Sequence, residues 1–100
     1  MQTQVEIEYE GSKKFFTLKT VGYEKWEELQ RIILPRIIRQ DGQMEILSSA
    51  MTEYNKKLIL ASIEATGSNI DLSKVDAIGY QILLAKATEV HTLTAEKEKN

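Results

Sequence analysis

Apolar and polar residues alternate in two short segments at the start of the chain. The apolar positions of these segments are Val5, Ile7 and Tyr9, and then Phe16 and Leu18. A period of two predicts β-strands that bury one face. Gly11-Ser12 lies between the segments, and a glycine at the first central position of a two-residue turn favours a type II′ hairpin. The pattern therefore predicts an antiparallel β-hairpin.

This turn predicts a register and, with it, two chemically different faces. It pairs Ile7 with Phe16, and Val5 then lies opposite Leu18. The apolar face holds Val5, Ile7, Phe16 and Leu18, and the polar face holds Glu6, Glu8, Phe15 and Thr17. An isolated hairpin is only marginally stable in water, so we expect the apolar face to pack on helices or to pair with another chain.

The first of three stretches with helical spacing follows the hairpin. We expect this helix to begin near Gly22–Glu24, where acidic residues suit the positive end of the helix dipole. It should kink or end around Leu34, because Pro35 removes a backbone donor and crowds the preceding turn. Its predicted inward residues are Trp26, Leu29, Ile33 and Ile32. Asp41-Gly42 then predicts a turn.

The second predicted helix runs from about Glu45 or Ser49 to Ala65 and ends before Gly67. Its start is open, because Ser48, Ser49 and Thr52 are all residues that cap helices well. Its inward stripe is predicted to hold Met51, Tyr54, Leu58, Ala61 and Ala65, with Leu47 extending it by one turn and Ile63 lying off it.

The third predicted helix follows Ser73, with Asp76 at the capping-box position, and should fade near His91 to Leu93. Its predicted inner stripe consists of Val75, Ile78, Gly79, Ile82, Leu83 and Ala87. The fold class is therefore α+β, an N-terminal antiparallel β-hairpin followed by about three α-helices. One hundred residues, 42% of them hydrophobic, fit a single domain over residues 1–93. We expect residues 94–100 to form a polar, disordered tail.

Composition narrows the classes of function. Cysteine is absent and histidine occurs once, which excludes disulfides and thiolate chemistry and leaves the usual Cys/His zinc sites unsupported. A net charge of −2 lacks the clustered basic face typical of nucleic-acid binding. The N-terminus lacks the pattern of a signal peptide, and no apolar run approaches the ~18–20 residues of a membrane span. We therefore expect a cytoplasmic protein with neither nucleic-acid nor membrane partners.

Three groups of polar residues deserve a test as chemical sites. Glu6, Glu8 and Glu10 place carboxylates on one strand, as a hard-cation site or an acid–base pair would require, but alternation alone explains them. His91 has no cysteine or second histidine to share a metal, and a capping role at a helix end is the simpler interpretation. The basic residues Lys25, Arg31, Arg36 and Arg39 form a weak anion-binding candidate, because glutamates lie beside them. We predict no catalytic, cofactor-binding or metal-binding residue, and no cofactor.

Aromatic and apolar residues outside the helical stripes indicate a protein-binding surface. The candidates for partner binding are Tyr23, Trp26, Leu34, Ile37 and Ile38. Tyrosine and tryptophan are enriched at interface hot spots, and surplus apolar residues in a small domain favour a groove or an oligomer surface. The alternative is that these residues fill a broad core, and for Trp26 core filling is the default at helical spacing.

One family resemblance rests on two segments, FTLKTVGYEKWEELQ and NKKLILASI. A strand of the type F-x-L leads through a threonine-containing link to a helix with Y/W-x-E-L character. The residues in those places are Phe16, Leu18, Thr20, Tyr23, Trp26, Glu28 and Leu29, and Leu58 to Ile63 match a second, Leu- and Ile-rich helix. In this the chain resembles the tail assembly chaperones of long-tailed bacteriophages and prophages over roughly residues 14–93. The segment PRIIRQDGQM departs from that pattern.

The resemblance implies a non-enzymatic role. Such a chaperone would bind the tape measure protein, keep its apolar helices from aggregating and assist tail-tube subunits to assemble around it. Weak binding by each domain would suffice, since many copies act along one client, and a homo-oligomer is compatible with this role. The alternatives are another small structural or connector protein of a phage particle, and a regulatory module that binds a host protein.

Overall fold

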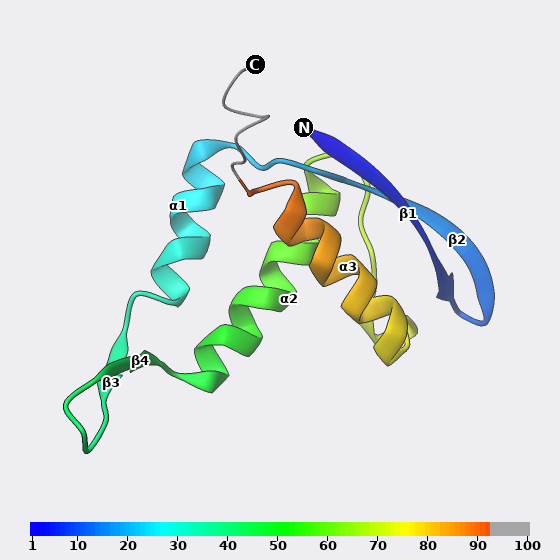
Figure 1. The fold of residues 1–100 in the computed structure, drawn as a ribbon. Coiled ribbons are helices and arrows are strands. Elements are labelled where there is room, and N and C mark those ends of the chain that lie inside the picture. Colours follow the sequence, from blue (N-terminus) through cyan, green and yellow to red (C-terminus); the bar gives the residue numbers. More distant parts are fainter. Residues whose placement is uncertain (93–100) are drawn as a thin grey trace.

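The computed structural model describes residues 1–92 and confirms the α+β class (Figure 1). The elements are β1 (Gln2–Tyr9), β2 (Ser12–Lys19), α1 (Tyr23–Ile32), β3 (Arg36–Ile38), β4 (Met44–Ile46), α2 (Ser48–Glu64), the 3-10 turn η1 (Leu72–Lys74) and α3 (Ala77–Glu89). β1 pairs with β2, and β3 pairs with β4 in a separate two-stranded sheet. The sequence pattern did not predict β3, β4 or η1.

The N-terminal hairpin has the predicted faces but a different register. Val5 lies opposite Phe16, and Ile7 lies opposite Lys14, so the predicted pairing is wrong by two residues. The turn consists of Glu10 and Gly11, both with positive φ (54° and 82°), as in a type I′ turn. A slip of two residues leaves every side chain on its face, because strand side chains repeat every two residues. The apolar pattern therefore could not distinguish the two registers.

Cross-strand charge pairs and the length of the hydrogen-bonded ladder both favour the observed register. It places Glu8 opposite Lys13, whereas the predicted register would have placed Glu8 opposite Phe15. Lys13 also forms an ion pair with Glu6, at 3.8 Å. The ladder continues to the end of the strands, where the Thr20 N–H donates to the Met1 carbonyl at 2.9 Å. Opposite charges across a strand pair stabilise it by a few tenths of a kcal/mol each.

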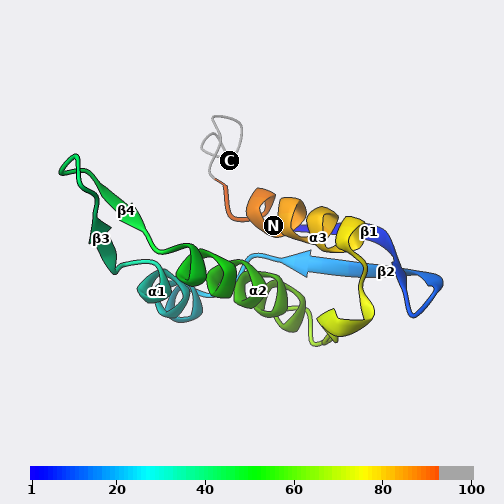
Figure 2. The same ribbon diagram turned by 90° about the horizontal axis from the view of Figure 1, so that it is seen from below.

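The core lies between the inner face of the hairpin and the helices. Helix α3 packs against both β1 and α2, and α2 also packs against β2 and α1 (Figures 1 and 2). The most completely buried apolar side chains are Leu18, Leu29, Ile59, Ile63 and Leu83. Leu18 and Leu29 were predicted to face inward. Ile63 was placed off the α2 stripe, but it is fully buried because α2 has neighbours on more than one side.

The helices end where proline and glycine were predicted to stop them, but the predicted capping side chains do not act at the start of α2. Helix α1 ends just before Pro35, and Gly67 has the positive φ of 88° expected after α2. Helix α2 begins at Ser48 after Leu47, and no side chain caps its first turn, so none of the three predicted caps acts there. Ala65 was predicted to face inward but is exposed, because it follows the last turn of α2.

The start of α3 differs from the prediction in a similar way. Ser73 lies in η1, and Asp76 is the N-cap of α3, with its carboxylate accepting a 2.7 Å hydrogen bond from the Gly79 N–H. Gly79, Leu83 and Ala87 are buried, as predicted for the inner stripe. Ile78 and Ile82 were also assigned to that stripe, but they are exposed, at 69% and 37%. The reason is the width of the sheet, since no strand of the described chain lies beneath this side of α3.

The molecule is flat, with extents of 47 × 37 × 22 Å and a radius of gyration of 15.2 Å. A compact domain of this length has a radius of gyration of about 13 Å. The β3–β4 hairpin projects from the body at the opposite end from the tip of the β1–β2 hairpin (Figures 1 and 2). No helix in the described part of the chain is long and apolar enough to cross a membrane. The predicted tail, residues 94–100, lies outside the described residues.

Candidate protein-interaction surface

The projecting segment, residues 34–47, is called the arm. Its strands pair Ile37 with Glu45 and Ile38 with Met44. The Arg39 N–H donates to the Gln43 carbonyl at 2.7 Å, and this pair closes the loop. Gly42 takes a positive φ of 85° in the loop, as a three-residue hairpin connection with a glycine in the left-handed region requires. The predicted Asp41-Gly42 turn is therefore the tip of this hairpin.

The arm exposes a row of large apolar side chains. Ile38 is 75% exposed, and its cross-strand neighbour Met44 is 66% exposed. The other exposed apolar residues of the arm are Leu34, Ile37 and Leu47. Leu34, Ile37 and Ile38, three of the predicted partner-binding residues, are thus all exposed on the arm, with Ile37 and Ile38 on opposite faces of β3. Met44 and Leu47 lie on the same hairpin because β3 pairs with β4. Strands of three residues are too short to give a clear alternating pattern, so the sequence did not predict this pairing.

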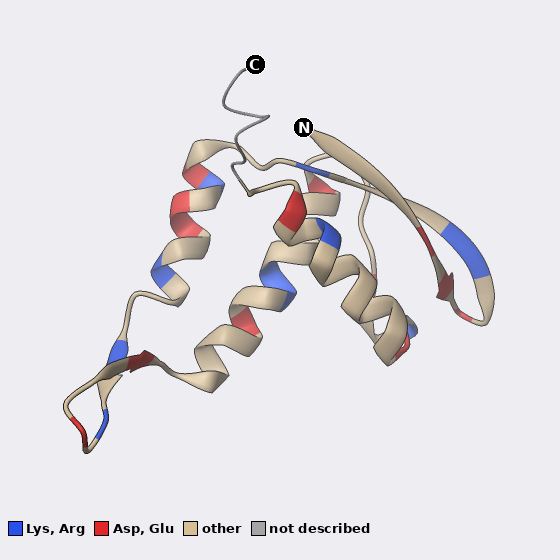
Figure 3. Ribbon diagram, viewed as in Figure 1, with Lys and Arg blue, Asp and Glu red and all other residues tan. Residues whose placement is uncertain are grey.

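Charges of both signs lie on the arm. Arg39 pairs with Asp41 at 3.8 Å and with Glu45 at 3.7 Å. The Arg36 guanidinium turns back and donates to the carbonyls of Ile33 and Leu34 at the end of α1. Figure 3 shows blue and red segments together on the arm rather than one sign of charge.

The predicted basic cluster around Pro35 is largely neutralised on α1 as well. Arg31 pairs with Glu27 at 2.9 Å, and Lys25 pairs with Glu28 at 3.6 Å. These are exposed pairs one helical turn apart, each worth a few tenths of a kcal/mol. The arrangement presents no free basic face to an anion.

The two aromatic candidates have different surroundings. Tyr23, the first residue of α1, is 76% exposed and available to a partner. Trp26 is partly buried against the core, and its ring stacks on His91 with centroids 5.2 Å apart and planes at 12°. Trp26 therefore has a packing role in this structure, the alternative that its helical spacing already favoured.

His91 lies at the end of α3, where it joins three segments. The Val21 N–H donates to His91 Nε2 at 3.0 Å, and Nδ1 lies 2.7 Å from the Ala87 carbonyl. Since Nε2 accepts, the proton is on Nδ1, which donates to Ala87. The Thr20 hydroxyl donates to the Val90 carbonyl at 2.8 Å beside it. These contacts, here called the clasp, hold the end of α3 against the β2–α1 link, so His91 binds backbone and Trp26.

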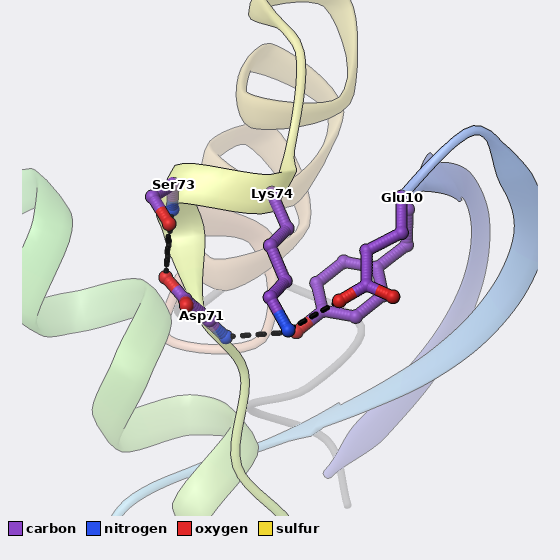
Figure 4. Close-up of polar contacts among 5 residues, drawn as sticks. Glu10, Asp71, Ser73 and Lys74 are labelled. Carbon is purple, nitrogen blue, oxygen red and sulfur yellow. Dashed lines mark hydrogen bonds and ion pairs between the residues drawn. The ribbon is translucent and has the colours of Figure 1, made fainter.

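The strand carboxylates do not converge. Glu6 pairs with Lys13, and Glu10 forms an ion pair with Lys74 across to η1 (Figure 4). No group of three or more His, Asp or Glu within residues 1–92 could hold a metal ion. Every buried side-chain nitrogen or oxygen among the described residues has a hydrogen-bond partner. The polar groups of this region thus act within the fold.

The pKa values that shift are those of exposed residues beside η1. The Ser73 hydroxyl donates to the Asp71 carboxylate at 2.6 Å and the Ser73 N–H does so at 3.0 Å, which lowers the pKa of Asp71 (Figure 4). The hydrogen bond with Glu10 and the charge of Glu10 raise the pKa of Lys74. Both shifts favour the charged forms already present at neutral pH. They stabilise a turn and create no reactive group.

Comparison of the chain with protein-family models, with curated proteins and with solved structures finds no match. The functional interpretation therefore depends on the residues and their geometry. The arm, part of which the sequence predicted as a binding surface, holds five of the ten exposed large hydrophobic residues of the described chain. Ile78 and Ile82 of α3 form a second exposed apolar surface. The sequence indicated it only through the predicted apolar stripe of α3, which is wider than a two-stranded sheet can cover.

Proposed function

We propose that this protein is a non-enzymatic assembly chaperone that binds an elongated client protein through its arm. The exposed row on the arm carries this proposal. Monomeric proteins rarely leave neighbouring large apolar side chains in water, and the pair Ile38 and Met44 is more than half exposed on a hairpin that projects from the body. A partner that covers these side chains would gain about 25 cal/mol for each Å² of apolar area buried.

The proposed client is the tape measure protein of a long-tailed phage, with tail-tube subunits as the assembly partner. The resemblance of residues 14–93 to tail assembly chaperones supports this identity through β2, α1 and α2, whereas the arm contains the segment PRIIRQDGQM that departs from the family pattern. A thin hairpin with apolar side chains could lie along a helical client, and Tyr23 at the start of α1 offers a further aromatic contact. Weak binding by each copy would allow release after the tail is complete.

Co-expression with the tape measure protein of a long-tailed phage tests the proposal. The wild-type protein should co-purify with that client and raise its soluble yield. The double variant Ile38→Ser/Met44→Ser should lower the recovered client by roughly tenfold, since interface hot spots lie in such apolar clusters. Gln81→Ser, at an exposed position of α3, is the matched control and should behave as wild type. Circular dichroism should show both variants folded.

Two outcomes would count against it, and a third would change the partner assigned to the arm. A client that neither co-purifies nor gains solubility with the wild-type protein contradicts the chaperone role. Stable retention of the protein in finished particles would favour the connector alternative, because a chaperone departs. A concentration-dependent oligomer that disappears in Ile38→Ser/Met44→Ser would show that the arm joins copies of this chain.

A further inference from the structure

The outer edge of β1 carries backbone groups that face away from β2. Met1 and Thr20 form a hydrogen-bonded pair across the hairpin, so odd-numbered residues of β1 bond to β2. The N–H of Glu10 points the other way and donates to the Lys74 carbonyl at 3.2 Å. Because backbone direction alternates along a strand, the N–H and C=O groups of Gln4, Glu6 and Glu8 face outward with it.

This edge is already used as a sheet edge at one end. Val75 forms an antiparallel bridge with Tyr9, next to the Glu10–Lys74 hydrogen bond. The chain then leaves the edge and enters α3 at Ala77. Within the described chain nothing else pairs with this side of β1. Val75 is thus the only residue of the described chain that pairs with this edge as a third strand would.

Helix α3 overhangs the place where that strand would lie. Ile78 and Ile82 are exposed beside the edge, although the helical pattern assigns both to the inner stripe. A groove of about 400 Å³ runs between β1 and α3, lined by Glu6, Ile7, Glu8, Lys13, Asp76, Ile78, Gly79 and Ile82. One wall is therefore a free strand edge, and the opposite wall is an apolar helix face.

We propose that this groove binds an extended peptide segment of another protein, which adds to β1 as a third strand. At the usual strand separation of about 4.8 Å, the backbone of the segment would meet the outward groups of Gln4 and Glu6, since Asp76 lies opposite Glu8 beside the Tyr9–Val75 bridge. Every second side chain of the segment would point toward α3 and contact Ile78 and Ile82. The remaining side chains would lie on the polar face, beside Glu6 and Glu8.

The surrounding charge selects the chemistry of the segment. Three carboxylates, those of Glu6, Glu8 and Asp76, line the groove against the single ammonium of Lys13, which already pairs with Glu6. Lys or Arg directly opposite a glutamate stabilises a strand pair, and a like charge destabilises it. The occupant is therefore a segment that alternates apolar residues, facing α3, with basic residues, facing the glutamates.

A second copy of this chain does not meet these requirements with its hairpin. The inward side chains of both strands, such as Ile7 and Leu18, are buried in the copy's own core and cannot turn toward a neighbour's α3. Pairing of β1 with another β1 would also bring glutamates together without a basic residue, because the polar face of β1 carries only Gln and Glu. The segment must come from a chain with both faces free.

The test uses a synthetic peptide of about eight residues, the length of β1, in which Val and Lys alternate. Amide hydrogen exchange, followed residue by residue by NMR, is the readout. Binding should slow exchange at Gln4 and Glu6, and leave Val5 and Ile7 unchanged because their N–H groups already bond to β2. The same peptide with Glu in place of Lys should bind at least tenfold more weakly.

Variants of the groove separate the contributions of backbone hydrogen bonds, apolar contacts and charge to peptide binding. Glu6→Pro removes one outward N–H without touching the ladder to β2, and should weaken Val/Lys peptide binding at least tenfold relative to its charge-matched control Glu6→Gln. Ile78→Ser/Ile82→Ser should weaken binding similarly, and it keeps the test open if the proline variant is unstable. Glu6→Lys/Glu8→Lys should reverse the preference between the two peptides.

Absence of peptide binding at millimolar concentration would overturn the proposal, as would protection at Lys13, Phe15 and Thr17 on the β2 edge instead. Protection of Gln4 and Glu6 that depends on protein concentration without peptide would identify a second copy as the occupant and overturn it too. Ile38→Ser/Met44→Ser changes only the arm, at the other end of the molecule (Figure 1). That variant should bind the peptide as the wild type does. The groove proposal and the proposal that the arm binds a client can therefore fail independently.

Discussion

Asp76 shows how one side chain sets the start of a helix. Its carboxylate accepts from the Gly79 N–H at 2.7 Å and satisfies a donor that the first turn of α3 leaves free. Ser73, three residues earlier, bonds instead to Asp71 within η1. The sequence pattern placed both residues at this boundary but assigned the start to the wrong one. Both are good caps, and the local sequence alone does not rank them.

Replacing Asp76 with alanine should lower the free energy of unfolding by about 1 kcal/mol, because alanine cannot accept the Gly79 hydrogen bond. Asp76→Asn should change stability much less, since asparagine caps about as well. Urea denaturation monitored by Trp26 fluorescence measures both. An equal or larger loss in Ser73→Ala than in Asp76→Ala would contradict the assignment of the cap.

At the scale of elements, a glycine lets the segment before α3 pack tightly over the first turn of that helix. A Cβ built on Gly79 would lie 2.8 Å from Val75 Cγ1, 3.1 Å from Asp76 Oδ1 and 3.6 Å from Ile7 Cβ. Glycine in a helix interior normally costs about 1 kcal/mol relative to alanine. The tight packing of Val75 and the Asp76 cap over Gly79 offsets that cost, and Gly79 also lines the groove beside β1.

Gly79→Ala should therefore destabilise the protein on the order of 1 kcal/mol, because the overpacking cost of about 1–3 kcal/mol exceeds the gain in helix propensity. The matched control is Ala85→Gly, at an exposed position of the same helix, which should also lose about 1 kcal/mol. Thermal unfolding by circular dichroism measures the two changes. A more stable Gly79→Ala variant would show that Val75 moves aside freely.

At the scale of the whole molecule, the clasp joins parts of the chain that are far apart in sequence. His91 Nε2 accepts from the Val21 N–H, 70 positions away, and the Thr20 hydroxyl bonds to the Val90 carbonyl across the same distance. Trp26 covers the imidazole ring. A flat molecule with a thin core has few long-range contacts of this kind, so the clasp should contribute to the docking of α3 on the hairpin.

His91→Ala should reduce the free energy of unfolding by about 1–3 kcal/mol, the typical cost of leaving a buried donor such as the Val21 N–H without its partner. Amide exchange at Val21 should accelerate by more than exchange at Leu29 in α1. Thr88→Ala, an exposed change on the last turn of α3, should alter stability by less than about 0.5 kcal/mol. Unchanged exchange at Val21 would mean that water replaces the imidazole without loss.

Much of the candidate interaction surface could be predicted from apolar residues that lie outside the helical stripes. Leu34, Ile37 and Ile38 were recognised in this way, and all three are exposed on the arm. Met44 escaped notice because its exposure depends on the pairing with Ile38 across a turn. Trp26 and Tyr23 were both interface candidates; helical spacing already favoured packing for Trp26, and the structure shows its ring stacked on His91 while Tyr23 is exposed.

Periodicity and breakers were sufficient for the class of fold, the faces of the hairpin, the end of α1 before Pro35 and the turn at Asp41-Gly42. These features depend on neighbours along the chain, where side-chain spacing and backbone chemistry act directly. The register of the hairpin, the cap of α3, the burial of Ile63 and the exposure of Ile78 and Ile82 required the folded molecule. Each of them depends on how many elements pack against a given face, and packing partners distant in sequence leave no local pattern.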